Sequence, residues 1–182
     1  MTQYNILPGQ SNFRPLENPM FRACSGFDMA IRFDKSCWWS PEDWQGDKDR
    51  DDWNKAKMIS WWFSFNDCHS AGFAWRPADE KFVFDLIAYT NPKCGEWVTT
   101  GEPVKIYAGE MAYARCRAGK RIVEYEIEYY GNISKYSHSW KRPWPWLCRE
   151  VGTSIGGANN SPGPYGGKAT QAMKMEIDFQ LV

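Results

Sequence analysis

Apolar and polar residues alternate with a period of two along most of this chain, whereas helical periodicity is nearly absent. In FDMAIRF, the apolar residues Phe27, Met29, Ile31 and Phe33 fall on one face. The same pattern recurs in MISWWFSF (58–65), FVFDLIAY (82–89) and IVEYEIEYY (122–130). Because successive side chains of a strand point to opposite faces, each stretch predicts a half-buried β-strand.

Shorter strands are predicted near 71–76, 104–107, 112–116 and 147–155, which brings the total to about nine or ten. Turn-rich connections such as RPADEK and CRAGKR separate them. A chain of 182 residues fits one domain with one large core. The sequence therefore predicts a single all-β domain over residues 1–182, an antiparallel jelly-roll sandwich.

The bulk composition narrows the range of partners. Lys plus Arg and Asp plus Glu both total 22, so no net field attracts nucleic acid or an anionic membrane. No apolar run is long enough for a membrane span, so we expect no membrane insertion. The first residues lack a signal-peptide pattern, so we expect a chain that acts inside a cell, leaves it by a route that needs no such signal, or is released by lysis, for example in a virion.

Six cysteines are widely spaced and form no C-x-x-C pair, which argues against a zinc or redox motif. Without a secretory signal, the expectation is that most of them are free thiols. The acidic loop DKDRDD has Asp47, Asp49 and Asp51 at the spacing of a calcium loop, but Asp52 replaces the required glycine. We expect a solvated loop there, and neither a metal site nor a cofactor in the protein.

The chain closes with MKMEIDFQLV, in which Glu176, Asp178 and Gln180 share one strand face. Some glycosidases place a nucleophile and a general acid on one strand in this way. Here the position of the acid is held by Gln180, which has no proton to give. The pattern therefore predicts the solvated face of a C-terminal strand.

The face opposite the core side of the central strands is the predicted binding site. On its face of the predicted strand, Trp62 lies between Ser60 and Ser64. Three further residues, Arg76, Asp85 and Tyr89, lie on the non-core side of the neighbouring stretches. An aromatic platform beside charged groups is what a saccharide groove requires. The alternative is a second layer that covers this face and buries Trp62. The stretch KRPWPW (141–146) could stack on sugars or could form a lid.

Four short motifs occur in order: DDWNK (51–55), SAGFAWR (70–76), AYT (88–90) and YGG (165–167). In these the chain resembles uncharacterised concanavalin-A-like jelly-roll proteins of gut-type bacteria and their phages, and more distantly jelly-roll polysaccharide lyases. The resemblance implies a cleft with Lys55, Trp75, Arg76 and Tyr89 around it, although alternation sends Trp75 to the core. The chain departs from the pattern at Gly72, where an arginine is expected, and at KATQA (168–172).

We therefore expect non-catalytic carbohydrate binding or a virion-associated role in adhesion. The expected partners are carbohydrate or neighbouring virion proteins. If the protein is part of a virion, we also expect a homo-oligomer. One alternative is a polysaccharide lyase, in which Arg76 or Lys55 neutralises a uronate and Tyr89 or His69 removes a proton. No serine or histidine motif supports a hydrolase triad around His69 or His138. The other alternative is a purely structural capsid or tail component.

Overall fold

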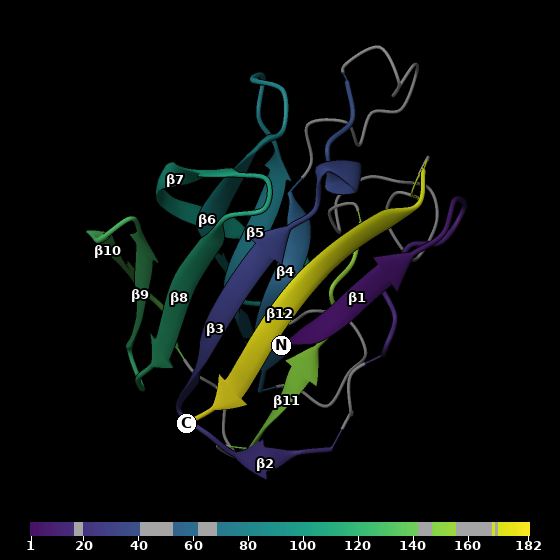
Figure 1. Cartoon of the computed structure of the whole chain (residues 1–182). Coiled ribbons are helices and arrows are strands. Elements are labelled where there is room, and N and C mark those ends of the chain that lie inside the picture. The colour runs from purple at the N-terminus through teal and green to yellow at the C-terminus, as the bar shows by residue number, and fades with distance from the viewer. Residues whose placement is uncertain (17–19, 41–52, 62–68, 142–146, 156–168, 170) are drawn as a thin grey trace.

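The protein, seen here in a computed structural model, consists of two six-stranded antiparallel sheets packed face to face (Figure 1). The structure describes residues 1–16, 20–40, 53–61, 69–141, 147–155, 169 and 171–182. The first sheet has the order β1 (Thr2–Ile6), β12 (Met173–Leu181), β3 (Gly26–Phe33), β8 (Met111–Ala118), β9 (Ile122–Tyr129) and β10 (Asn132–Ser139).

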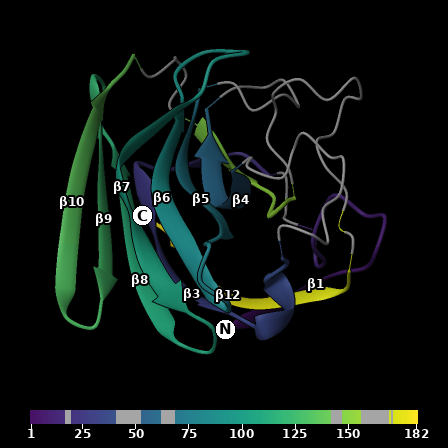
Figure 2. The same cartoon turned by 90° about the horizontal axis from the view of Figure 1, so that it is seen from above.

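The second sheet has the order β2 (Arg22–Ala23), β11 (Leu147–Val151), β4 (Asn54–Ser60), β5 (Ser70–Pro77), β6 (Val83–Asn91) and β7 (Val98–Tyr107). A short 3-10 helix, η1 (Lys35–Cys37), follows β3. Figure 2 shows the first sheet bending around the second. The predicted jelly-roll sandwich is confirmed. Below, the inward face of a sheet is the one that meets the other sheet, and the outward face is the opposite one.

The core lies between the two inward faces, and it is built from the alternation seen in the sequence. Phe27, Met29, Ile31 and Phe33 of β3 are all buried there. Aromatic rings join the sheets: the Phe33 and Phe84 centroids lie 4.6 Å apart in a stacked arrangement. Burying one such side chain contributes about 1.5–3 kcal/mol, so these rings are a main source of the sandwich's stability.

Three strands were not predicted from the sequence: β1, β2 and β10. The residues of β10 are exposed or half-buried throughout, because it is the edge strand of the first sheet. A strand with no fully buried face shows little apolar alternation, so its sequence carries a weak strand signal. Tyr136 of β10 nevertheless covers Gly101 of β7 and donates a hydrogen bond of 2.7 Å to the carbonyl of Glu102, which joins the two sheets at this edge.

The pairing of β4 with β5 contains a bulge at Ala56, where the register shifts between Lys55 and Lys57. The Thr153 hydroxyl donates to the carbonyl of Ala56 at 2.7 Å. Beside the bulge, a Cβ atom added to Gly72 would lie 2.2 Å from the carbonyl oxygen of Lys57. The arginine expected at position 72 from the family resemblance is therefore excluded by the backbone.

The expectation of mostly free cysteines is wrong: of the five cysteines in the part of the chain that the structure describes, three are disulfide-bonded. A disulfide joins Cys24, next to β2, to Cys148 of β11, and Cys94 is also disulfide-bonded. Cys37 and Cys116 are free and buried. The sequence could not show the first pairing, because 124 positions separate the two cysteines and only the adjacency of β2 and β11 brings them together.

A second apolar cluster lies on the outward face of the second sheet. Met58, Ala74, Ile87 and Tyr89 are all buried there, and Val151 joins them. This corrects the expectation of an open face, since the central part of the face is shielded from solvent. As for membranes, none of the helices in the described ranges has the length and apolar character needed to span one.

Candidate functional site

The predicted binding residues on the outward face of the second sheet are mostly buried. Asp85 and Tyr89 lie on β6 and Lys55 lies on β4, and only 2–6% of each of their surfaces is exposed. Burial lowers the pKa of Lys55 to about 8, because the charged ammonium is removed from water. An open saccharide groove is thus not formed by these three residues.

Arg76 is the exception, with about a third of its side chain exposed. Its Nε donates to Asp85 Oδ2 at 3.3 Å, and Lys105 Nζ donates to Asp85 Oδ1 at the same distance. The guanidinium carbon lies 4.4 Å from the centre of the Trp53 ring. The structure therefore brings the predicted residues Arg76 and Asp85 together, and it adds Trp53 and Lys105, which were not predicted as site residues.

Tyr89 stacks on Trp97, with ring planes 8° apart and centroids separated by 5.9 Å. Because the two rings stack, Trp97 covers one face of Tyr89, and Trp97 itself is partly exposed to solvent. Trp75, which the resemblance placed at the cleft, is fully buried in the core, as alternation predicted. Trp62, the central residue of the predicted groove, lies outside the described residues.

Other sequence candidates have limited structural support. The acidic loop with Asp47, Asp49 and Asp51, and most of KRPWPW, lie outside the described residues. Burial lowers the pKa of His69. In the part of the chain that the structure describes, no group of three or more His, Cys, Asp or Glu residues is arranged to hold a metal ion.

A groove of about 250 Å³ lies on the opposite side of the molecule, on the outward face of the first sheet. It crosses the four central strands β12, β3, β8 and β9. The outward-pointing side chains of these strands line the groove. They are Asp28, Ala30, Tyr113, Arg115, Glu126, Glu128, Asp178 and Gln180.

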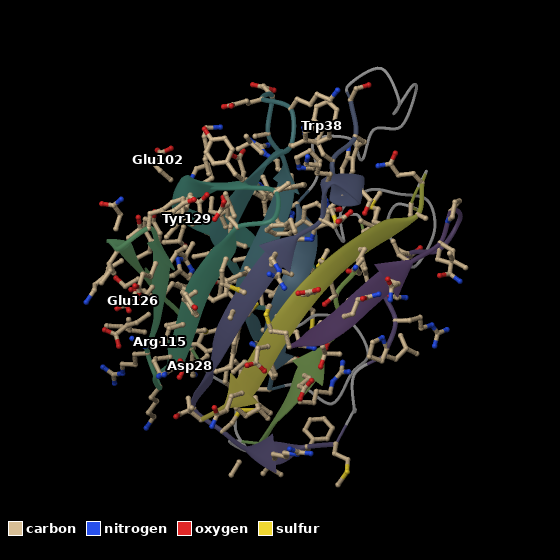
Figure 3. All side chains as sticks on the ribbon, viewed as in Figure 1. Asp28, Trp38, Glu102, Arg115, Glu126 and Tyr129 are labelled. Carbon is tan, nitrogen blue, oxygen red and sulfur yellow. A yellow bond between two sulfur atoms is a disulfide. The ribbon has the colours of Figure 1, made fainter. Side chains whose placement is uncertain are left out.

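Ion pairs hold the polar groups on one side of this groove in place. Figure 3 shows Asp28, Arg115 and Glu126 in a row across β3, β8 and β9. Arg115 contacts Asp28 at 3.2 Å and Glu126 at 2.8 Å. Arg117 Nη2 lies 2.5 Å from Asp28, and Lys135 Nζ lies 3.3 Å from Glu126. Each surface pair is worth little by itself, but the linked set fixes the directions of its hydrogen-bonding groups.

The adjacent row of the groove contains its hollow and its aromatic ring. Strand register aligns Asp178, Ala30, Tyr113 and Glu128 as direct neighbours across four strands. Ala30 is the smallest side chain in this row, so it leaves space between its neighbours. Tyr113 is 55% exposed, and its ring is available to a ligand.

This site was not predicted from the sequence, although the facing of its side chains was. Asp178 and Gln180 were assigned to a solvated strand face, and the alternation in IVEYEIEYY puts the three glutamates of β9 on the face opposite its apolar residues. In YARCRA, Tyr113, Arg115 and Arg117 alternate with small buried residues, which is the one local signal that was available. Which strands are neighbours was not visible, since β12 and β3 are far apart in sequence.

Comparisons with known proteins provide no family. No protein-family model matches the sequence, and no curated protein is significantly similar to it. Among solved structures, the chain is similar to a functionally unknown protein from Saccharomyces cerevisiae, with a TM-score of 0.40 and 12% sequence identity. That match covers 87% of this chain and 71% of the other. A similarity of this size assigns no function.

Proposed function

We propose that this protein binds carbohydrate without cleaving it, in the groove on the outward face of the first sheet. The observation that supports this most is the combination of a hollow at Ala30, an exposed Tyr113 ring and a set of polar side chains held by ion pairs. Sugars present C–H faces that pack on aromatic rings and hydroxyls that bond to carboxylates, amides and guanidinium groups.

The polar groups suit hydroxyl recognition because they are fixed before a ligand arrives. Arg115 is held between two carboxylates, so little side-chain entropy is lost when it also contacts a ligand. Gln180 can both donate and accept hydrogen bonds, and it lies opposite Asp28 in the strand register. The groove is open along the sheet, which fits a chain of sugars better than a small enclosed ligand.

The lyase alternative has less support than binding. It needs Lys55 or Arg76 as a cation and Tyr89 or His69 as a base in one accessible cleft. Tyr89 and Lys55 are buried, and Arg76 is engaged by Asp85 and Trp53. Nothing in the described residues favours proton abstraction at these positions.

The Cys24–Cys148 disulfide supports a site of action away from the reducing cytosol. It is compatible with an adhesion component of a virion, which meets an oxidising environment after release. A purely structural capsid or tail role would cover the groove with neighbouring subunits. Symmetric assembly is common for such modules, so a homo-oligomer belongs to both proposals.

A glycan-array scan followed by titration of the bound sugars tests the proposal. We expect Tyr113→Ala to lower affinity about five- to tenfold, because a stacked ring contributes about 1 kcal/mol or more. Arg115→Ala should lower it as well. Tyr107→Ala is the matched control, since Tyr107 is exposed to a similar degree as Tyr113 and lies outside the groove. Thermal melts confirm that each variant is folded.

The other outcomes are equally informative. Absence of binding by the folded wild type contradicts the proposal and favours protein neighbours as ligands. Binding that is lost in Arg76→Ala but kept in Tyr113→Ala moves the site to the outward face of the second sheet. Unsaturated products from a panel of uronate polymers, detected by ultraviolet absorbance, would instead support the lyase.

A further inference from the structure

We infer that the saccharide recognised by this groove carries a protonated amine, as in an unacetylated amino sugar. This inference rests on the proposed function, because it concerns the ligand class of the same groove. It follows from the charges of the lining residues. Four carboxylates line the groove (Asp28, Glu126, Glu128 and Asp178), against one cation, Arg115.

The four carboxylates are not equivalent. Asp28 is paired with Arg115 and Arg117, and Glu126 is paired with Arg115 and Lys135. No ion pair joins Glu128 or Asp178 to another residue in the described ranges. The groove therefore has one neutralised side and one side that keeps two uncompensated negative charges.

These two charges flank the hollow and the ring. In the strand register, Asp178 is adjacent to Ala30, and Glu128 is adjacent to Tyr113. Neighbouring strands lie about 4.8 Å apart, so the backbones of Asp178 and Glu128 are separated by roughly 14 Å. An ammonium above the Tyr113 ring has an aromatic face beneath it and a carboxylate on either side, an arrangement that attracts cations.

A neutral or acidic sugar fits this row less well. Uronate or sulfate groups would meet Asp178 and Glu128 as like charges, which costs affinity. A neutral sugar gains hydrogen bonds but leaves both charges without a partner. An amine-bearing sugar supplies charge and hydrogen-bond donors together, and its binding weakens as salt screens the exposed charges.

The test compares glucosamine oligomers with N-acetylglucosamine and glucose oligomers of the same length and linkage, by calorimetric titration near pH 6, where an amine is protonated. We expect the amine form to bind about tenfold more tightly than the acetylated form, and this advantage to fall with added salt. Asp178→Asn and Glu128→Gln should each remove several-fold of the amine advantage and leave the affinity for the acetylated form within about twofold.

Glu124→Gln is the matched control. Glu124 lies on the same strand and the same face as Glu128 but outside the groove, so its neutralisation should change neither affinity. Equal affinity for the three oligomers, or an amine advantage that survives both groove variants, overturns the inference. In that case binding that is lost in Tyr113→Ala still upholds the proposed function. No binding to any oligomer or array sugar overturns both.

Discussion

Some charged side chains of this sandwich are buried although lysine ordinarily lies in solvent, and Lys55 is one of them. It lies on the outward face of the second sheet, where it is almost completely buried, and burial lowers its pKa from 10.5 to about 8. The folded chain thus releases this proton at a lower pH than the unfolded chain does.

This shift predicts a pH dependence of stability. Between pH 8 and 10.5 the unfolded chain keeps a proton on Lys55 that the folded chain has lost, so the free energy of unfolding rises with pH in that window. Over the whole window the lysine's contribution amounts to about 3 kcal/mol. The measurement is urea unfolding of the wild type and Lys55→Met at several pH values from 7 to 10.

The comparison with the variant is needed because other groups titrate nearby. Burial raises the pKa of Tyr125, Cys37 and Cys116, so their unfolded forms lose protons first and stability falls above their ordinary pKa values. These contributions are common to both proteins and cancel in the difference. Identical pH profiles for wild type and Lys55→Met would show that Lys55 is not desolvated as described.

At the scale of elements, the β4 bulge and β5 illustrate how close packing restricts a position. Gly72 has no unusual φ angle, so its requirement is purely one of space beside Lys57 and Met58. Because the two nearest atoms, the Lys57 carbonyl oxygen and the Met58 Cα, belong to the backbone, they cannot rotate aside. We predict that Gly72→Ala lowers the free energy of unfolding by about 3 kcal/mol, near the upper end for overpacking.

Gly95→Ala is a suitable control for that experiment. Gly95 has a φ of +79° and open space around its Cα, so an added methyl group there costs only the left-handed conformation, about 1 kcal/mol. Chemical denaturation of both variants gives the comparison. A loss in Gly72→Ala no larger than that in Gly95→Ala would mean that the two strands separate without difficulty.

At the scale of the whole molecule, the Cys24–Cys148 disulfide connects an early segment to a late one across 124 positions. Its effect belongs to the whole chain, since such a cross-link chiefly restricts the unfolded state. We predict that Cys24→Ala/Cys148→Ala lowers the free energy of unfolding by about 2–5 kcal/mol. Thermal and urea unfolding without reductant measure it.

Adding reductant to that double variant measures the contribution of the disulfide at Cys94 to the free energy of unfolding. A double variant that melts at the temperature of the wild type would contradict the prediction. The two sheets share one apolar core, as expected for a single domain over residues 1–182. We therefore expect the thermal and urea unfolding of both proteins to be cooperative.

The amino-acid sequence by itself determined the fold class and the facing of most side chains. Alternation placed Phe27 to Phe33 and Phe84 to Ala88 correctly, because the pleat of a strand is a local property that each residue carries with it. It also placed Asp178 and Gln180 on a solvated face. Strands without a buried face, such as β10, remained undetected for the same reason.

Only the tertiary structure decided which faces are covered and which strands are neighbours. It buried Lys55, Asp85 and Tyr89 on a face that alternation could describe only as non-core, and it paired Cys24 with Cys148. It also aligned Asp178 with Ala30, Tyr113 and Glu128 in one row. Strand order and register depend on contacts between distant segments, and no local pattern in a single sequence encodes them.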